Sequence, residues 1–195
     1  MSSSVDTGDL PLVEGVVAGT TAWIVGYLLT ALVLLARLDG SELGDISDTV
    51  GGGNSIDFIG WVFFNSHFVG TVVEAGFLGF GGSNTTSFVG GDGFTPLLYL
   101  VPVALLIGAG LAVGRARGVA GTTDGAVAGS LVVLPYLALS IIGAVLFRVS
   151  TEGLGASFSG RPELLPAVLL AGVVFPAVLG ALGGIVAGNT GPGRA

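Results

Sequence analysis

Cysteine and lysine are both absent from the 195-residue chain. Without cysteine there can be no disulfide framework, thiolate nucleophile, iron–sulfur cluster or cysteine-ligated zinc ion. The basic residues are six arginines against thirteen Asp and Glu, which gives a formal net charge of −7. A chain so poor in cations has no basic patch that could neutralise phosphates, so we expect no nucleic-acid partner.

Charged residues of either sign are also scarce. They make up 10% of the chain, whereas soluble domains carry about 25%. Hydrophobic residues make up 51%, and the mean hydropathy is +0.92. These values exclude a small soluble enzyme and predict an integral membrane protein.

Four stretches without charge are long enough to cross a bilayer, whose hydrocarbon core takes about 20 apolar helical residues. A charge at the centre of such a helix costs about 2.5–3.5 kcal/mol, so charged residues mark the helix ends. We therefore predict helices near 14–36, 95–114, 124–147 and 163–187. The expected fold class is all-α: one polytopic membrane domain over 1–195, with four transmembrane helices arranged as two hairpins.

The long connection over 38–94 holds an apolar, aromatic segment at about 56–79. Asn65, His67 and Glu74 interrupt it, and its aromatic side chains suit the headgroup level of a bilayer. We expect an amphipathic helix here, interfacial or re-entrant. A fifth span is the alternative, and it would place the two termini on opposite sides of the membrane.

Arg115 and Arg117 lie in the shortest loop, where positive charge best indicates the cytoplasmic side. We therefore expect a multi-pass protein of the cell membrane with both termini in the cytoplasm and the long acidic loop outside. The N-glycosylation acceptor pattern Asn84-Thr85-Thr86 falls in that outer loop and agrees with this orientation.

The start of the first predicted helix resembles the start of the third. Residues 14–20 (EGVVAGT) align with residues 124–130 (DGAVAGS). This match predicts two duplicated hairpins related by an axis along the membrane normal. The alternative is that Gly- and Ala-rich helices resemble each other through composition alone.

Small residues four positions apart recur on every span, and such spacing lets helix backbones approach closely. Nine glycines carry the pattern: Gly15, Gly19, Gly110, Gly114, Gly125, Gly129, Gly180, Gly184 and Gly188. We interpret them as helix-packing positions within the chain, with a dedicated dimer face as the alternative.

Four residues are candidates for a functional role: Glu14, Asp124, His67 and Glu74. Glu14 and Asp124 each start a helix, where a carboxylate stabilises the helix N-terminus by about 0.3–1 kcal/mol. The functional alternative is a symmetric pair that takes a cation or proton at the cytoplasmic mouth. His67 is the single histidine and Glu74 stands seven residues on, but a metal needs three or four convergent ligands. We expect a hydrogen-bonded or interfacial histidine and no metal site.

Catalytic signatures are missing as well. The sequence has no P-loop, Gly-x-Ser-x-Gly elbow, His-Glu-x-x-His pair or dinucleotide fingerprint. We therefore expect no catalytic residues, no cofactor and no enzymatic activity.

The absence of lysine, the four glycine-rich spans and the run from Trp61 to Val69 (WVFFNSHFV) together carry a resemblance. In layout the whole chain resembles small haloarchaeal multi-pass membrane proteins of unknown function, some of which are loosely labelled as transporters. The resemblance implies a halophilic archaeon as the source and supplies no catalytic or binding residues.

Two functions are consistent with these observations. The first is an accessory or structural membrane subunit that contacts the lipid bilayer and a membrane-protein partner. The alternative is a small oligomeric transporter or channel for an ion or small solute. The arrangement of the polar groups in the helices would distinguish the two functions: convergence inside the bundle would favour transport, and dispersal would oppose it. The candidate groups are Thr20, Thr21, Tyr27, Thr30, Ser130, Tyr136 and Ser140.

Overall fold

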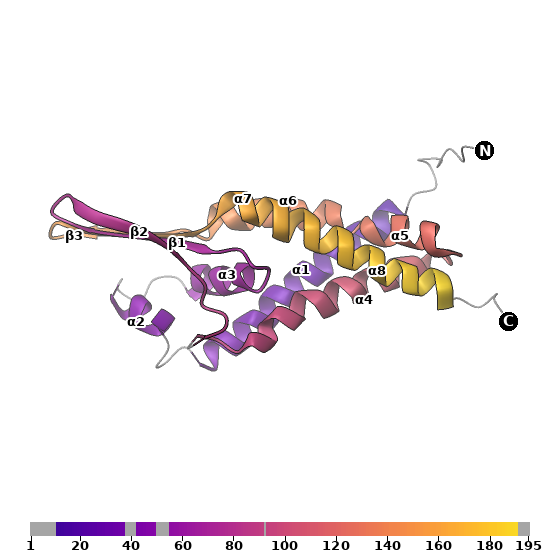
Figure 1. Cartoon of the computed structure of the whole chain (residues 1–195), viewed down its shortest axis with the longest axis horizontal. Helices are drawn as coiled ribbons and strands as arrows, with labels where there is room; N and C mark the ends of the chain where they lie inside the picture. The colour runs from indigo at the N-terminus through magenta and orange to yellow at the C-terminus, as the bar shows by residue number, and fades with distance from the viewer. Residues whose placement is uncertain (1–10, 38–41, 50–54, 92, 191–195) are drawn as a thin grey trace.

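A computed structural model describes residues 11–37, 42–49, 55–91 and 93–190 (Figure 1). Its helices and strands follow one another in this order: α1 (Leu12–Leu35), α2 (Glu42–Thr49), α3 (Ser55–Asn65), β1 (Thr71–Phe77), β2 (Phe80–Thr86), the short 3-10 helix η2 (Pro96–Tyr99), α4 (Leu100–Ala116), α5 (Thr122–Ser130), α6 (Val133–Leu146), β3 (Val149–Gly153), β4 (Ala156–Pro162), α7 (Leu164–Pro166), the π-helical segment η3 (Ala167–Val174) and α8 (Phe175–Thr190).

Four helical stretches are long and apolar enough to cross a membrane: Leu12–Leu35, Pro96–Ala116, Thr122–Leu146 and Leu164–Thr190. Four such helices agree with the number predicted from the charge-free stretches. Their outer faces carry exposed leucine, valine and isoleucine, including Leu28, Leu32 and Leu146. A surface of this kind suits contact with lipid rather than water.

The third and fourth of these stretches are irregular inside. A turn at Leu131 and Val132 separates α5 from α6, and Pro135 follows in the first turn of α6. In the last stretch, Pro166 and Pro176 flank the π-helical segment η3. Proline has no backbone N–H to donate, so the ordinary helical hydrogen bonding is interrupted near each of these positions.

Helix α8 packs against α4 and α5 with almost no side chain between the backbones. A Cβ atom added at Gly184 would collide with the carbonyl oxygen of Gly125, and one at Gly110 would collide with that of Gly180. Gly188 meets the carbonyl oxygen of Gly121 in the same way. Glycine alone permits this approach, and close packing is what holds helices together in lipid.

All nine glycines of the repeated spacing lie in contacts within the chain. Gly15 and Gly19 of α1 meet Leu131 and Val132 at the break between α5 and α6. Gly114 meets the side chain of Ala187, and Gly129 and Gly180 meet each other's backbones. These positions therefore serve packing inside one copy of the chain.

The expected all-α class is wrong, because the chain also forms a four-stranded antiparallel sheet in the order β2-β1-β4-β3. Hairpin β1–β2 lies in the long connection after α1, and hairpin β3–β4 joins α6 to α7. Strand β1 falls within the segment predicted to be an amphipathic helix at about 56–79, and β3 and β4 fall between the helices predicted near 124–147 and 163–187. Each hairpin alone is too short to give a strong pattern, and only the β1–β4 pairing joins them into one sheet.

The aromatic segment at 56–79 is divided between a helix and a strand. Helix α3 has 11 residues and is buried from Asp57 to Asn65, so it is too short for a fifth span and has no exposed polar face along this stretch. Trp61 Nε1 donates to the Phe147 carbonyl oxygen at 3.0 Å, and Gly160 of β4 packs on the Trp61 ring. Helix α3 thus fills the junction between the bundle and the sheet.

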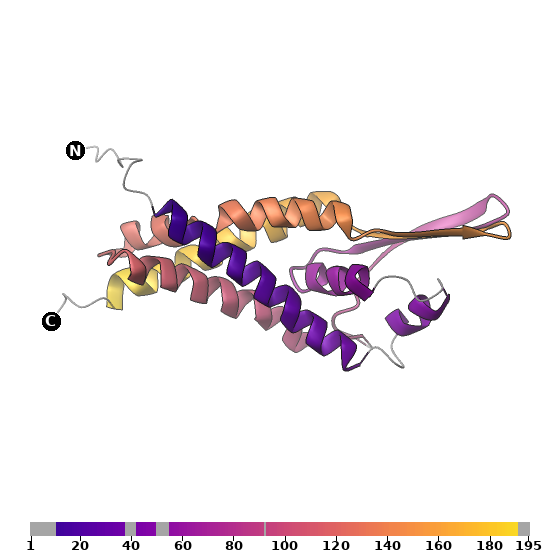
Figure 2. The ribbon, with the colours of Figure 1, turned by 180° about the vertical axis from the view of Figure 1, so that it is seen from behind.

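The first residues of α1 and the last residues of α8 lie at one end of the bundle, and the sheet projects from the other (Figure 1 and Figure 2). The Gly121 N–H donates to the Gly188 carbonyl oxygen at 2.9 Å, and Arg117 pairs with Glu14 at 3.6 Å. Arg117 and the pattern at Asn84, in β2, therefore lie at opposite ends. Which end faces the cytoplasm stays a prediction.

The order of strands does not follow the proposed duplication. The inner strands of the sheet are β1, the first strand of its hairpin, and β4, the second strand of its own. A duplicated unit would place equivalent strands, such as β1 and β3, in equivalent positions. The likeness of residues 14–20 to residues 124–130 therefore has no counterpart in the sheet.

Two glycine substitutions test the packing of α8. We expect Gly184→Ala to lower the free energy of unfolding by about 1–3 kcal/mol, because the helices must separate. Gly108→Ala is the matched control, since no atom of the described residues lies within 4 Å of a Cβ at Gly108; it should leave stability unchanged or raise it by up to about 1 kcal/mol. Unfolding in mild detergent measures both, and equal losses would contradict this packing.

Candidate functional site

The candidate site is a buried polar cluster around His67, where α3, α6 and the sheet meet. His67 is fully buried. Its Nδ1 lies 2.9 Å from the Phe63 carbonyl oxygen and its Nε2 lies 2.8 Å from the Tyr136 hydroxyl. Because a carbonyl oxygen can only accept, Nδ1 carries the proton, and Nε2 accepts from Tyr136. Both ring nitrogens are therefore satisfied in the neutral form.

Asn65 is the second centre of this cluster. Its Nδ2 donates to the Val69 carbonyl oxygen at 2.8 Å and to Thr71 Oγ1 at 3.1 Å. Its Oδ1 accepts from the Phe88 N–H at 2.8 Å. One side chain thereby joins the end of α3 to β1 and to the segment after β2, where irregular backbone would otherwise leave buried polar groups unpaired.

The surroundings of His67 favour its uncharged form. The rings of Phe63, Tyr136 and Phe175 lie 4.8, 5.8 and 5.3 Å from the imidazole, centroid to centroid. Burial lowers the pKa of His67 to about 4, and the hydrogen bond to the Phe63 carbonyl opposes that shift. A neutral, enclosed and fully hydrogen-bonded imidazole stabilises the fold and is not placed to exchange protons with solvent.

The four candidate residues of the sequence do not come together. Glu14 lies at the end of the bundle away from the sheet and pairs with Arg117, and Asp124 lies in the first turn of α5. Glu74 lies on the exposed sheet, 3.8 Å from Arg161, where it accepts from Ser159 at 3.2 Å. Across residues 11–37, 42–49, 55–91 and 93–190, no three His, Cys, Asp or Glu side chains gather as a metal site would require.

Polar groups of the bundle are also dispersed. Thr30 and Ser130 each donate to a carbonyl oxygen of their own helix, and Tyr27 donates to the Ile56 carbonyl oxygen. Tyr136 is held by His67, whereas Ser140 is buried and its hydroxyl has no hydrogen-bond partner within the described part of the chain. These groups form separate local contacts rather than a continuous polar stripe.

A second feature was missed at the level of sequence: an exposed apolar surface at the far end of the sheet. We call it the apolar tip, and its residues are Phe77, Leu78, Phe80 and Leu154. Phe80 is 84% exposed and Leu154 is fully exposed. Each hairpin turns through two residues, Leu78-Gly79 and Leu154-Gly155.

The two turns of the apolar tip hold leucine in a backbone conformation that leucine rarely adopts. Leu78 and Leu154 have φ of 51° and 50°, and the following glycines also have positive φ. Two-residue turns of this kind favour Asn-Gly, and a left-handed leucine costs about 1–3 kcal/mol. The Leu-Gly pair also occurs inside α2 and α8, so in the sequence it does not mark these two turns.

Comparison with known proteins gives a family but no function. The model of a family described as "Family of unknown function (DUF7978)" matches residues 1–191. No curated protein and no solved structure matches the chain.

Removing one hydroxyl tests the structural role of His67. We expect Tyr136→Phe to lower the free energy of unfolding by about 1–3 kcal/mol, because His67 Nε2 loses its only donor in a buried place. Ser159→Ala is the control: the Ser159 hydroxyl donates to Glu74 at 3.2 Å on the exposed sheet, so water can replace it. Thermal unfolding in detergent compares the two. A loss for Tyr136→Phe no larger than the control's would contradict this role.

The lowered pKa of His67 also predicts how stability depends on pH. In the unfolded chain His67 takes up a proton near its ordinary pKa of about 6.5, whereas in the folded chain it does so only near 4. The unfolded state therefore binds more protons between these values, so stability is lost as pH falls from about 6.5 to 4, by up to about 3 kcal/mol. Unfolding of the wild type and of His67→Gln across this range isolates the effect, and parallel curves would contradict it.

Proposed function

The chain belongs to this family of unknown function, and we infer its role from its own geometry. We propose that it is an accessory membrane subunit. Its four apolar helices anchor it in the bilayer, and its sheet docks a partner protein outside the bilayer. The apolar tip carries this proposal.

The apolar tip supports docking because it exposes large side chains where lipid does not cover them. The strands of the central pair are seven residues long, or about 23 Å at the usual rise per residue. The sheet extends from the bundle along the long axis of the molecule (Figure 1). Exposed apolar residues at this distance from the helices suit a protein interface rather than the membrane.

The turn conformation supports the same role. Asparagine in place of Leu78 and Leu154 would relieve the backbone, yet both turns carry leucine at the exposed position. Strain that recurs at one surface is typical of a site where the side chain is needed for function. The tip residues are also uncharged, as the central part of a protein interface usually is.

The sheet is attached to the bundle by short connections, so a partner docked on it would be held in a fixed position relative to the helices. Only Phe147 and Arg148 separate α6 from β3, and only Glu163 separates β4 from α7. Glu163 N–H donates to the Gly70 carbonyl oxygen at 2.9 Å, and Trp61 anchors α3 to Phe147. Short connections of this kind leave the sheet little freedom to swing relative to the helices.

A small oligomeric transporter or channel has less support. Thr30 and Ser130 each donate to a carbonyl oxygen of their own helix, and the Tyr136 hydroxyl donates to His67. Glycine contacts bring the backbones of α4, α5 and α8 together in the bundle. This arrangement favours a structural anchor over a path for ions.

The acidic, lysine-free composition supports a high-salt habitat, as expected for a halophilic archaeon. At about 1 M salt the Debye length falls to about 3 Å, which weakens recognition between exposed charges. Apolar contacts keep their strength under these conditions. A docking surface without charge, such as the apolar tip, is therefore suited to such a habitat.

The double variant Leu78→Asn/Leu154→Asn separates docking from folding. Asn-Gly is the preferred pair for these turns, so we expect unchanged or higher thermal stability together with loss of the partner. Both are measured on particles purified from the native membrane in mild detergent at high salt, by intact mass and by unfolding. Ser157→Ala is the control, because Ser157 lies on the sheet face opposite Phe77 and Phe80.

The expected result is a second protein at fixed stoichiometry with the wild type and with Ser157→Ala, and its absence from the double variant. A second protein that stays bound to the double variant would contradict docking at the tip. A wild-type particle that holds this chain alone and conducts ions in liposomes would favour the transporter.

A further inference from the structure

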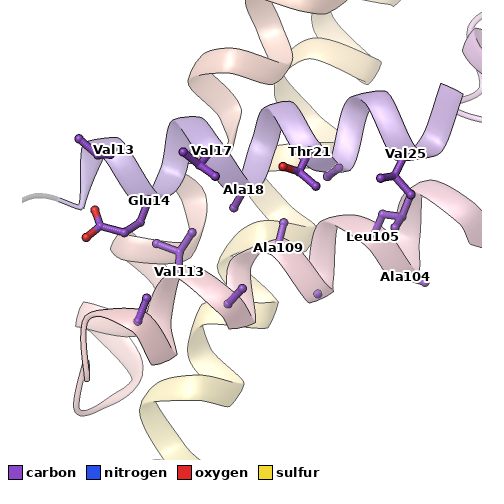
Figure 3. A pocket seen from close by; sticks show the side chains of 14 residues that line it. Val13, Glu14, Val17, Ala18, Thr21, Val25, Ala104, Leu105, Ala109 and Val113 are labelled. Atoms are coloured by element: carbon purple, nitrogen blue, oxygen red, sulfur yellow. The ribbon is translucent and has the colours of Figure 1, made fainter. Parts of the chain in front are cut away.

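A groove between α1 and α4 is an apolar hollow that the proposed docking leaves unused. It has a volume of about 580 Å³, and among the described residues only those of these two helices line it. Figure 3 shows Glu14 at one end of the groove and Val25 with Ala104 at the other, with Val17, Ala18 and Ala109 between them. We propose that the groove binds one acyl chain of a phospholipid whose phosphate lies at Arg115.

Helix α4 has two faces of small residues: one packs against α8, and the other is left uncovered by the described residues and forms one wall of the groove. Gly110 and Gly114 are covered by α8, where their backbones meet Gly180 and Ala187. Gly108 lines the groove, and no atom lies within 4 Å of a Cβ built there. The described part of the chain therefore leaves this face of α4 uncovered, and a flexible hydrocarbon chain is the kind of molecule that fills such a hollow.

The length of the groove fits one leaflet of a bilayer. Glu14 and Val25 are eleven residues apart on α1, which corresponds to about 17 Å of helix. A single leaflet contributes about 15 Å of hydrocarbon, half of the core thickness of about 30 Å. A transmembrane helix of a second copy would need a seam across the full core, so the groove matches a lipid chain better than a helix.

Charges stand at the end of the groove where a headgroup would lie. Glu14 lines the groove and its carboxylate pairs with Arg117 at 3.6 Å. Arg115 is exposed at the end of α4, seven residues after Gly108, and two helical turns place both on one face. Arginine binds phosphate through paired N–H groups. Because Arg117 offsets the negative charge of Glu14, the charge of Arg115 is left for a phosphate, and together with the apolar groove it matches a lipid with a phosphate headgroup.

Native mass spectrometry of the detergent-purified full chain tests the site, after delipidation and addition of phosphatidylglycerol. Gly108→Leu fills the groove and replaces a helix-interior glycine by a better helix former. We expect it to lower the retained lipid by at least about tenfold, because even two methylene groups kept out of the groove account for that factor. Ala138→Leu is the matched control, since Ala138 is exposed on α6 away from the groove.

A second pair of measurements tests the headgroup. Arg115→Gln should lower the retention of phosphatidylglycerol several-fold and leave that of diacylglycerol with the same chains unchanged. Equal loss of both lipids would overturn the phosphate assignment. Equal retention by Gly108→Leu and Ala138→Leu would overturn the lipid site, and so would a dimer of the wild type that Gly108→Leu dissociates. We expect the double variant Leu78→Asn/Leu154→Asn to retain its lipid. The lipid site and docking at the apolar tip are therefore tested independently of each other.

Discussion

Contact between helix backbones is the interaction on which the rest of the structure depends. In α8 the absence of side chains at Gly180, Gly184 and Gly188 lets its turns lie directly on carbonyl oxygens of neighbouring segments. Lipid offers little hydrophobic drive for helix association, so many close dispersion contacts must supply it. Because α4 is held from one side by α8, its opposite face, at Gly108, remains open and forms the groove with α1.

The junction between bundle and sheet solves a different problem. The chain leaves α3 through Phe68, whose φ is 59°, and enters β1 without a regular hydrogen-bond ladder. Asn65 and His67 supply the missing partners, and Trp61 ties α3 to the end of α6. Buried polar groups that are all satisfied specify one arrangement of the backbone. His67 is thus explained by the turn that it stabilises, which is the hydrogen-bonded role expected for a lone histidine.

Apolar residues are exposed in two regions with different solvents. Along the helices they lie on surfaces suited to lipid. The groove between α1 and α4, with arginines near one end, is the surface that we propose binds a phospholipid. At the apolar tip, which we propose lies outside the bilayer, Phe80 and Leu154 are exposed, and a protein partner would cover them. The same residue types therefore support two different kinds of binding, and only their position on the molecule distinguishes these.

The four apolar helices and the glycine positions at which they pack could be predicted from the sequence, because hydropathy and a spacing of four residues are local properties of the chain. The sequence did not determine the sheet. Strands β1 and β4 are separated by more than seventy residues, and each becomes stable only when it pairs with the other. The neighbours of His67 and Glu74, the apolar tip and the open face of Gly108 were likewise decided by tertiary structure. A contact between distant segments leaves no periodicity in either one, so the fold alone shows which surfaces are covered and which remain free.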